Sequence, residues 1–273
     1  MPRRVRVDAE LVRRGLARSR EHAVELVSAG RVQSAGATIA KPATAIEQHA
    51  PLHILAADEE ENWASRGARK LLGALEAWET RGLRVEGRRC LDAGASTGGF
   101  TDVLLARGAR EVVAVDVGYG QLVWRLQNDP RVLVHDRTNV RTLDAAMIGG
   151  TVGLIVADLS FISLDLVLPA FAACAADDAD LLPMVKPQFE VGKDRLGSGG
   201  VVRDPALRAE SVERIAMRSE ALGLGVRGVV ASPLPGPSGN VEYFLWLRKG
   251  SAGQVSAEEI RMMVETAVAE GPQ

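Results

Sequence analysis

The chain of 273 residues is long enough for two domains, and its hydrophobic share of 47% is ordinary for a globular protein with a sizeable core. The formal net charge of −2 excludes a uniformly basic chain, and no apolar run approaches the roughly 18 residues of a membrane-spanning helix. Cys90 and Cys174 lie in apolar segments, as free buried thiols do, and no histidine stands at metal-ligand spacing, so we expect no metal. The N-terminus lacks the apolar core of a signal peptide, which indicates a cytoplasmic protein without membrane contact.

Residues 1–50 have the pattern of a small basic module. The pattern predicts two helices and three short strands, over residues 8–16, 19–27, 31–34, 37–39 and 46–55. Asp8 and Ser19 stand where they can cap the two helices. The segment holds nine Lys and Arg against five Asp and Glu, and this surplus favours binding of a polyanion.

Three motifs of this module resemble the RNA-binding domain named after ribosomal protein S-four: Leu16-Ala17-Arg18-Ser19-Arg20-Glu21, Gly30-Arg31-Val32 and Lys41-Pro42. In that domain, basic side chains at the helix start and the hairpin contact the RNA backbone. Such phosphate contacts give affinity and salt dependence, and they carry little sequence information. The resemblance implies six RNA contacts, at Arg4, Arg6, Arg18, Arg20, Arg31 and Lys41.

A glycine-rich turn that follows an apolar strand, within residues 90–102, is the most informative stretch of the chain. Glycines there let the backbone approach a ligand closely, with N–H groups of the turn and the helix start aimed at it. About twenty residues further on, a second apolar run ends at Asp116, whose carboxylate can accept both hydroxyls of a ribose. The turn differs from the dinucleotide pattern G-x-G-x-x-G, and Asp92 before it suits a ligand with an ammonium group, such as S-adenosylmethionine. The spacing predicts a nucleoside-binding βαβ unit.

Strand-like runs alternate with helical stretches through the rest of the chain. The predicted helices cover residues 68–78, 98–106, 164–173 and 204–222. The predicted strands cover residues 112–115, 132–134, 154–157, 181–185, 226–231 and 241–247. This alternation predicts a mostly parallel sheet with helices on both faces, and the proline-rich loop 232–240 fits a final antiparallel hairpin.

Four ionisable residues point to chemistry at one edge of this sheet. Asp158 and Lys186 follow predicted strands, and Glu242 opens the last, antiparallel one, so all three fall where ligands gather in open α/β sheets. Lys70 begins the helix before the glycine-rich unit. Two lysines and two carboxylates can alternate in one cluster, and a lysine desolvated beside another cation can accept a proton near neutral pH. Methyl transfer to a ribose 2′-hydroxyl fits this set, because it needs in-line attack and a positioned base.

In this interpretation Lys186 is the base and Asp158 orients it. Lys70 and Glu242 place the ribose and tune the lysine pair. The predicted reaction needs neither a metal nor a covalent intermediate.

Motifs along nearly the whole chain resemble the TlyA family, also called haemolysin A, which is similar to FtsJ-type ribose methyltransferases. They are Ser65-Arg66-Gly67, Lys70-Leu71, residues 92–102, Arg137-Thr138-Asn139, residues 158–163, residues 186–190 and residues 236–242. The resemblance implies S-adenosylmethionine as cofactor and 2′-O-methylation of cytidine in 16S and 23S rRNA of ribosomal subunits. It places a Lys-Asp-Lys-Glu tetrad on Lys70, Asp158, Lys186 and Glu242. It implies cofactor contacts at Asp92, Gly94, Ala95, Ser96, Thr97, Gly98, Gly99, Phe100, Asp116, Asp136, Arg137 and Asp158.

The resemblance also implies a domain organisation. An RNA-binding domain covers residues 1–59, a linker covers residues 60–67, and a Rossmann-like methyltransferase domain covers residues 68–273. The linker departs from the family pattern at Glu61-Asn62-Trp63-Ala64, where related chains often have Arg-Ala-Trp-Val. The pattern indicates no particular oligomeric state.

Three other functions stay open at this point. A ribosome-assembly factor could bind the donor without using it, although the complete tetrad disfavours this function. A membrane-lytic haemolysin is disfavoured by the lack of a spanning segment. An α/β oxidoreductase is disfavoured by the glycine pattern and by the set of lysines and carboxylates.

Overall fold

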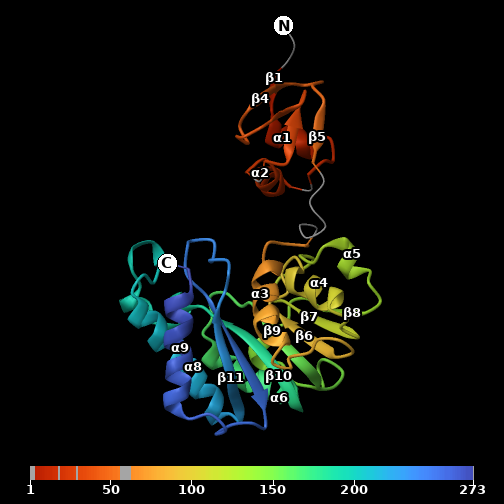
Figure 1. The fold of residues 1–273 in the computed structure, drawn as a ribbon. Helices are drawn as coiled ribbons and strands as arrows, with labels where there is room; N and C mark the ends of the chain where they lie inside the picture. Colours follow the sequence, from red (N-terminus) through yellow and green to blue (C-terminus); the bar gives the residue numbers. More distant parts are fainter. Residues whose placement is uncertain (1–3, 18, 29, 56–62, 273) are drawn as a thin grey trace. The chain divides into compact units, whose positions relative to one another are not determined.

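The computed structural model describes residues 4–17, 19–28, 30–55 and 63–272. They divide into two compact units, Met1–Asn62 and Trp63–Gln273, whose ribbons are drawn in Figure 1. The division falls inside the predicted linker, and the predicted boundary between residues 59 and 60 lies outside the described residues. Across the described ranges, no helix combines the length and apolarity needed to cross a membrane.

Within its described residues, the first unit contains two short helices and five very short strands. They are β1 (Arg4–Arg6), α1 (Val7–Arg13), α2 (Arg20–Ser28), β2 (Val32–Ser34), β3 (Ala37–Thr38), β4 (Ala45–Glu47) and β5 (Leu52–Ile54). β1 pairs with β4, and a second sheet has the order β3-β2-β5. Val7, Leu11, Val27 and Val32 are buried in its core.

Three details of the first unit differ from the prediction. The strand β1 was not predicted. The single strand predicted over residues 46–55 is wrong: β4 and β5 belong to different sheets. A turn closed by the N–H of Ala50 on the carbonyl of Glu47 reverses the chain between them. Ser19 accepts a hydrogen bond from the N–H of His22, as a cap does, whereas Asp8 lies inside α1 and does not cap it.

The second unit is a three-layer α/β structure around a seven-stranded sheet (Figure 1). Its strands are β6 (Arg89–Ala93), β7 (Glu111–Val115), β8 (Val132–His135), β9 (Val152–Ala157), β10 (Ala175–Val185), β11 (Leu224–Ala231) and β12 (Tyr243–Lys249). Its α-helices are α3 (Ala68–Glu79), α4 (Gly99–Ala106), α5 (Trp124–Gln127), α6 (Leu168–Cys174), α7 (Pro187–Glu190), α8 (Pro205–Ala221) and α9 (Ala257–Glu270). The strand order is β11-β12-β10-β9-β6-β7-β8, and β12 runs antiparallel to both of its neighbours. The predicted parallel sheet with a final antiparallel hairpin is confirmed.

Alternate residues of the central strands feed two separate cores, as a pleated strand requires. Cys90 and Leu154 face the layer of α3 and α4, whereas Leu91 and Ile155 face the layer of α6, α8 and α9. Both faces of the sheet are therefore covered, and its carboxyl edge is left for the site. Cys90 and Cys174 are free and buried, as predicted.

Two helical regions of the second unit depart from the sequence pattern. The helix predicted over residues 164–173 is a 3₁₀ turn (Leu164–Leu166) followed by α6, with Pro169 in the first turn of the helix. α9 was not predicted, although Ser256 and Glu259 form a complete capping box at its start.

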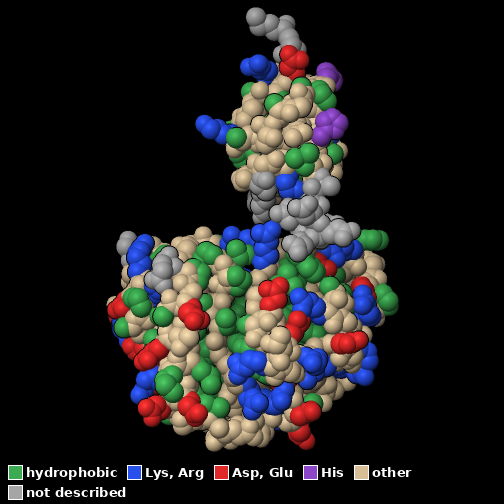
Figure 2. Space-filling model, viewed as in Figure 1, with side chains coloured by type: hydrophobic (Ala, Val, Ile, Leu, Met, Phe, Trp, Pro, Cys, Tyr) green, Lys and Arg blue, Asp and Glu red, His purple; other side chains and the backbone are tan. Residues whose placement is uncertain are grey.

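On the face of this unit drawn in Figure 2, basic and acidic side chains are interspersed.

Candidate active site

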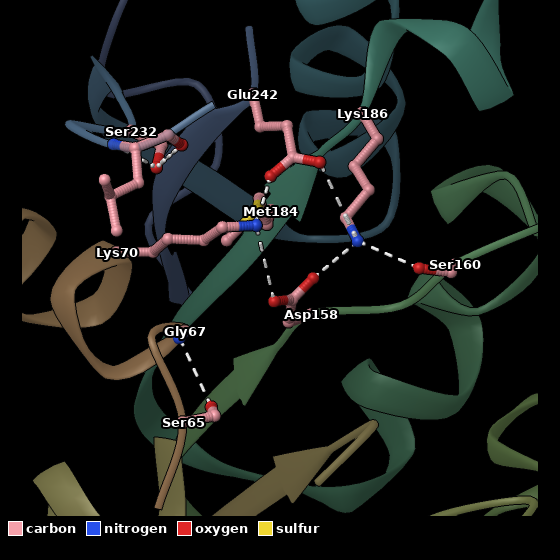
Figure 3. Close-up of polar contacts among 10 residues, drawn as sticks. Ser65, Gly67, Lys70, Asp158, Ser160, Met184, Lys186, Ser232 and Glu242 are labelled. Carbon is pink, nitrogen blue, oxygen red and sulfur yellow. Dashed lines mark hydrogen bonds and ion pairs between the residues drawn. The ribbon is translucent and has the colours of Figure 1, made fainter. Parts of the chain in front are cut away.

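The structure brings all four residues of the predicted tetrad together at the carboxyl edge of the sheet (Figure 3). Asp158 directly follows β9, Lys186 directly follows β10, and Glu242 directly precedes β12. Lys70 reaches the same point from the first turn of α3. The parallel register of β9 and β10, and the antiparallel return of β12, explain why residues so far apart in sequence meet.

Each lysine of the cluster lies between the two carboxylates. Lys70 Nζ is 2.5 Å from Glu242 Oε2 and 3.7 Å from Asp158 Oδ2. Lys186 Nζ is 2.5 Å from Asp158 Oδ1 and 4.0 Å from Glu242 Oε1. Lys186 also donates a hydrogen bond of 3.1 Å to Ser160 Oγ. The formal charges of the four residues therefore cancel within the cluster.

The four side chains differ in their access to solvent. Glu242 is 1% exposed and Lys70 is 6% exposed, so their ion pair is buried. Asp158 is 21% exposed. Its Oδ1 forms an ion pair with Lys186 Nζ, but the geometry of this contact is not that of a hydrogen bond. Asp158 is therefore the most accessible of the four, whereas Lys186, at 8% exposure, is nearly as buried as Lys70.

Three cavities meet at this cluster, and Ser160 lines all of them. The Asp116 cavity, of about 730 Å³, lies along the glycine-rich turn and also contacts Asp158. The Phe189 cavity, of about 720 Å³, contacts Lys186 and Glu242. The smaller Lys70 cavity, of about 260 Å³, lies between the glycine-rich turn and the tetrad. Two ligands can therefore approach the tetrad from different sides.

Most of the predicted cofactor residues line the Asp116 and Lys70 cavities. They are Gly94, Ala95, Ser96, Thr97, Gly99, Phe100, Asp116 and Asp158. Asp116 accepts hydrogen bonds from the N–H groups of Ser96 (2.8 Å) and Gly118 (2.7 Å), which fix its carboxylate at the cavity wall.

Asp92 is fully buried and lines none of these three cavities. Its Oδ2 accepts a hydrogen bond of 2.7 Å from Thr101, whereas its Oδ1 has no hydrogen-bond partner within the described part of the chain. Burial raises the pKa of this carboxyl to about 7, against the opposing effect of the Thr101 hydroxyl. A buried carboxylate oxygen without a hydrogen-bond partner is unfavourable, and a positively charged group beside the turn would stabilise it.

The glycines of the turn are required mainly by the protein itself. Gly94 and Gly98 have φ of 87° and 102°, which other residues rarely adopt. A Cβ on Gly94 would lie 2.7 Å from the carbonyl oxygen of Asp158, and one on Gly98 would lie 2.3 Å from Leu126. The sequence suggested that these glycines let the backbone approach a ligand closely. In the structure they first allow close packing against neighbouring parts of the chain.

Asp136 and Arg137 line none of the three cavities and support a neighbouring loop instead. Asp136 accepts a hydrogen bond of 2.9 Å from the N–H of Gly120. The Arg137 guanidinium lies 4.2 Å from the centre of the Tyr119 ring. Both residues therefore hold the segment that follows Asp116.

Three residues with side chains adopt the left-handed conformation around the site. They are Ser96 (φ 48°), Arg137 (φ 52°) and Phe161 (φ 63°). Such backbone geometry is uncommon for residues other than glycine and clusters at functional sites.

The Phe189 cavity has an aromatic wall that the sequence analysis did not assign. The Phe161 ring is 91% exposed and its centre lies 5.2 Å from that of Phe189. Thr138, Asn139 and Arg141 line the Asp116 cavity, and no site role was predicted for them from the sequence. The motifs contained several of these residues, but spacing alone gave them no role.

The predicted RNA contacts of the first unit fall into two groups. Arg6 and Arg20 pair with Asp8, at 2.7 Å and 3.3 Å, and the bond from Arg6 lowers the pKa of Asp8 to about 2. In the described part of the chain, Arg4, Arg31 and Lys41 have no carboxylate within ion-pair distance. Arg18 lies outside the described residues.

Comparison with known proteins supports the same division of the chain. The model of the FtsJ-like methyltransferases matches residues 63–249, and that of the S4 domain matches residues 5–49. The 16S/23S rRNA (cytidine-2′-O)-methyltransferase TlyA of Mycobacterium tuberculosis is 61% identical over 272 residues, which cover 100% of both chains. Hemolysin A of Brachyspira hyodysenteriae is 32% identical over 88% of this chain and 98% of its own length.

A solved structure from Streptococcus thermophilus, described as a hemolysin, has the same fold. It matches with a TM-score of 0.75 and 36% identity, over 99% of this chain and 97% of its own. Fold and sequence similarity therefore extend over nearly the whole length of the chain. The chain belongs to the TlyA family of FtsJ-like methyltransferases.

Proposed function

We propose that the protein transfers a methyl group from S-adenosylmethionine to the 2′-hydroxyl of cytidine in 16S and 23S rRNA, with the tetrad as its catalytic centre. The meeting of two large cavities at Asp158 and Lys186 carries this proposal, because one cavity can hold the donor and the other the acceptor. Membership of the methyltransferase family, with a 61% identical rRNA methyltransferase as relative, supports the reaction class. A substrate in ribosomal subunits places the protein in the cytoplasm.

The residues around the Asp116 cavity fit the donor. Its volume of about 730 Å³ lies within the range of roughly 300–1,000 Å³ that is typical of small-molecule pockets. Asp116 would accept the ribose hydroxyls, and the partnerless oxygen of Asp92 would favour the ammonium group nearby. When bound, the donor supplies a methyl group on a sulfonium, which is already activated for transfer.

The tetrad would prepare the acceptor hydroxyl. Lys186 lines the Phe189 cavity and the Lys70 cavity, so it can reach the hydroxyl and, as the neutral amine, take its proton. Asp158 holds Lys186 Nζ at 2.5 Å, and the buried pair of Lys70 and Glu242 fixes the other side. Alignment of the two reactants by these fixed groups is the main contribution expected of the protein.

The Phe189 cavity suits an unstacked nucleotide. The exposed Phe161 ring offers a flat apolar surface on which a base can stack, as in many sites that bind single-stranded RNA. Basic side chains of the first unit, including Arg4, Arg31 and Lys41, would contact phosphates away from the reacting nucleotide.

The direct test is incorporation of labelled methyl from S-adenosylmethionine into ribosomal subunits that lack ribose methylation, followed by mapping of 2′-O-methyl positions. We expect one modified cytidine in each responsive subunit with the wild-type protein and none with Lys186→Ala. Binding of the donor should stay within about threefold in this variant, because Lys186 does not line the Asp116 cavity and borders the predicted cofactor residues only in the smaller Lys70 cavity.

Two outcomes would contradict the proposal. Donor binding without transfer to subunits or naked rRNA would favour a non-catalytic assembly factor. Dye release from protein-free lipid vesicles at the concentrations used for catalysis would favour a membrane-lytic activity.

A further inference from the structure

The loop between the two large cavities is held from behind by a buried carboxylate that the proposed reaction does not use. This loop comprises residues 158–164, and Ser160, Phe161, Ile162 and Ser163 line both cavities. The position of the loop therefore sets the separation between whatever occupies one cavity and whatever occupies the other.

Glu190, at the end of α7, fixes the far end of the 158–164 loop. Its side chain is 1% exposed. Glu190 Oε2 accepts a hydrogen bond of 2.7 Å from Ser163 Oγ, and Oε1 accepts one of 2.8 Å from the N–H of Leu164. Arg214 on α8 donates to Oε2 at 2.6 Å and balances the charge.

α7 contacts the loop at three successive points. Lys186, just before the helix, holds Asp158 and Ser160 at one end of the loop. Phe189 packs against Phe161 in the middle, with ring centres 5.2 Å apart. Glu190 holds the other end through Ser163 and Leu164. One turn of helix thus serves as a template for the whole wall between the cavities.

We propose that Glu190 is a positioning residue for methyl transfer, which holds the 158–164 loop so that Ser160 and Phe161 keep the two reactants in line. The inference rests on the proposed function for its catalytic part. Glu190 lines neither large cavity, so it would not contact the ligands themselves. It acts through its hydrogen bonds to Ser163 and Leu164. Because displacement of reactants by about 1 Å can cost on the order of a hundredfold in rate, the alignment depends on this support.

The test compares Glu190→Ala with a control variant on α8. Glu213→Gln removes a carboxylate that pairs with Arg261 on the surface, at 3.2 Å and 30% exposure. Glu190→Ala removes both hydrogen bonds to the loop, those from Ser163 and Leu164. We expect Glu190→Ala to lower kcat by about ten- to a hundredfold. The control should stay within about threefold of the wild type, and the Kd for S-adenosylmethionine should change less than about threefold in both variants.

Hydrogen exchange of the segment 159–166 supplies a measurement that needs no RNA. The Leu164 N–H donates to Glu190 directly, so exchange in this segment should become at least about tenfold faster in Glu190→Ala and stay unchanged in Glu213→Gln. If Glu190→Ala does not fold, Ser163→Ala, which removes one of the two bonds to the loop, should show the same effects at smaller size.

Unchanged exchange together with unchanged kcat in Glu190→Ala would overturn the inference, as would a loss of donor binding equal to the loss of kcat. A wild-type protein that transfers no methyl group would overturn the proposed function and the catalytic part of this inference. The exchange result would then still decide whether Glu190 fixes the loop.

Discussion

Charged side chains are buried at both ends of the central sheet, but the surroundings of these side chains differ between the two ends. At the carboxyl end, Asp158 and Lys186 face cavities on both sides of the tetrad. Near the amino end, Asp180 is fully buried and accepts hydrogen bonds from Trp246 (2.7 Å), Arg248 (2.9 Å) and Arg88 (2.7 Å). Asp180 lines none of the three cavities at the tetrad.

Access to a cavity, rather than burial or charge, therefore separates the two clusters. Donors surround the Asp180 carboxylate on both oxygens, so its free energy of burial is offset within the fold. The tetrad is also neutral as a set, yet Asp158 lines the Asp116 cavity and Lys186 lines the Phe189 cavity. A buried charge saturated with donors supports the fold, whereas a buried charge beside a cavity is available for chemistry.

The largest effect is expected where the cluster faces the cavities. Lys186→Met keeps the length of the side chain and removes the ammonium, so kcat should fall by roughly 10²–10⁴-fold. Its free energy of unfolding should fall less than its activity, because Lys70 Nζ, 3.7 Å from Asp158 Oδ2, stays as a second cation beside that carboxylate. Rates at saturating donor and RNA, measured beside urea unfolding, check both expectations. A variant that loses stability in proportion to activity would place Lys186 with the structural charges.

Asp92 sharpens the comparison, because it is buried at the carboxyl end but has one oxygen without a partner in the described part of the chain. Its pKa is about 7 in the folded protein, against about 3.9 in an unfolded chain, so folding binds a proton between these values. The stability that this group contributes is complete below about pH 4 and is lost as the pH rises to about 7. Relative to Asp92→Asn, the wild type should thus lose roughly 3 kcal/mol over this range. Urea unfolding of both proteins at several pH values gives the difference, and parallel curves would refute the assigned pKa.

Asp180→Asn should affect stability and leave chemistry intact. The substitution removes the charge that Arg88 and Arg248 share, and these are 25% and 30% exposed. Because both arginines reach solvent in part, we expect a loss of about 2–3 kcal/mol, below the cost for a fully enclosed pair. The control is Asp177→Asn, on the exposed stretch of the same strand. Loss of kcat in the folded Asp180→Asn protein would break the division between the two ends.

The first unit offers the smallest and most salt-dependent effect. Arg31→Ala with Lys41→Ala removes two cations that have no carboxylate within ion-pair distance in the described part of the chain. The slope of log affinity for RNA against log salt should fall by about one for each phosphate that no longer meets a cation. Arg6→Ala, whose guanidinium already pairs with Asp8, should change the slope less. Equal slopes for all these variants would move the RNA contact to another surface.

The sequence predicted the sheet and the meeting of the four charged residues at its edge, because both follow from local patterns; the catalytic role of the four residues stays a prediction. Long apolar runs mark the central strands, and Asp158 and Lys186 follow such runs directly, so the parallel topology places them at one edge. β4 and β5 have three residues each, too few for a periodicity, and their pairing with different strands is a long-range property. The role of Glu190 was equally hidden, because its partners lie 24 to 27 residues away.

The left-handed residues around the site have a consequence for protein engineering. Glycine or asparagine at positions 96, 137 or 161 would relax a backbone that holds Ser96, Arg137 and Phe161 in an uncommon conformation. A search for thermostable variants would therefore tend to select such replacements. Each of them would replace a side chain of the site or its supporting loop, so the gain in stability would come with a loss of activity.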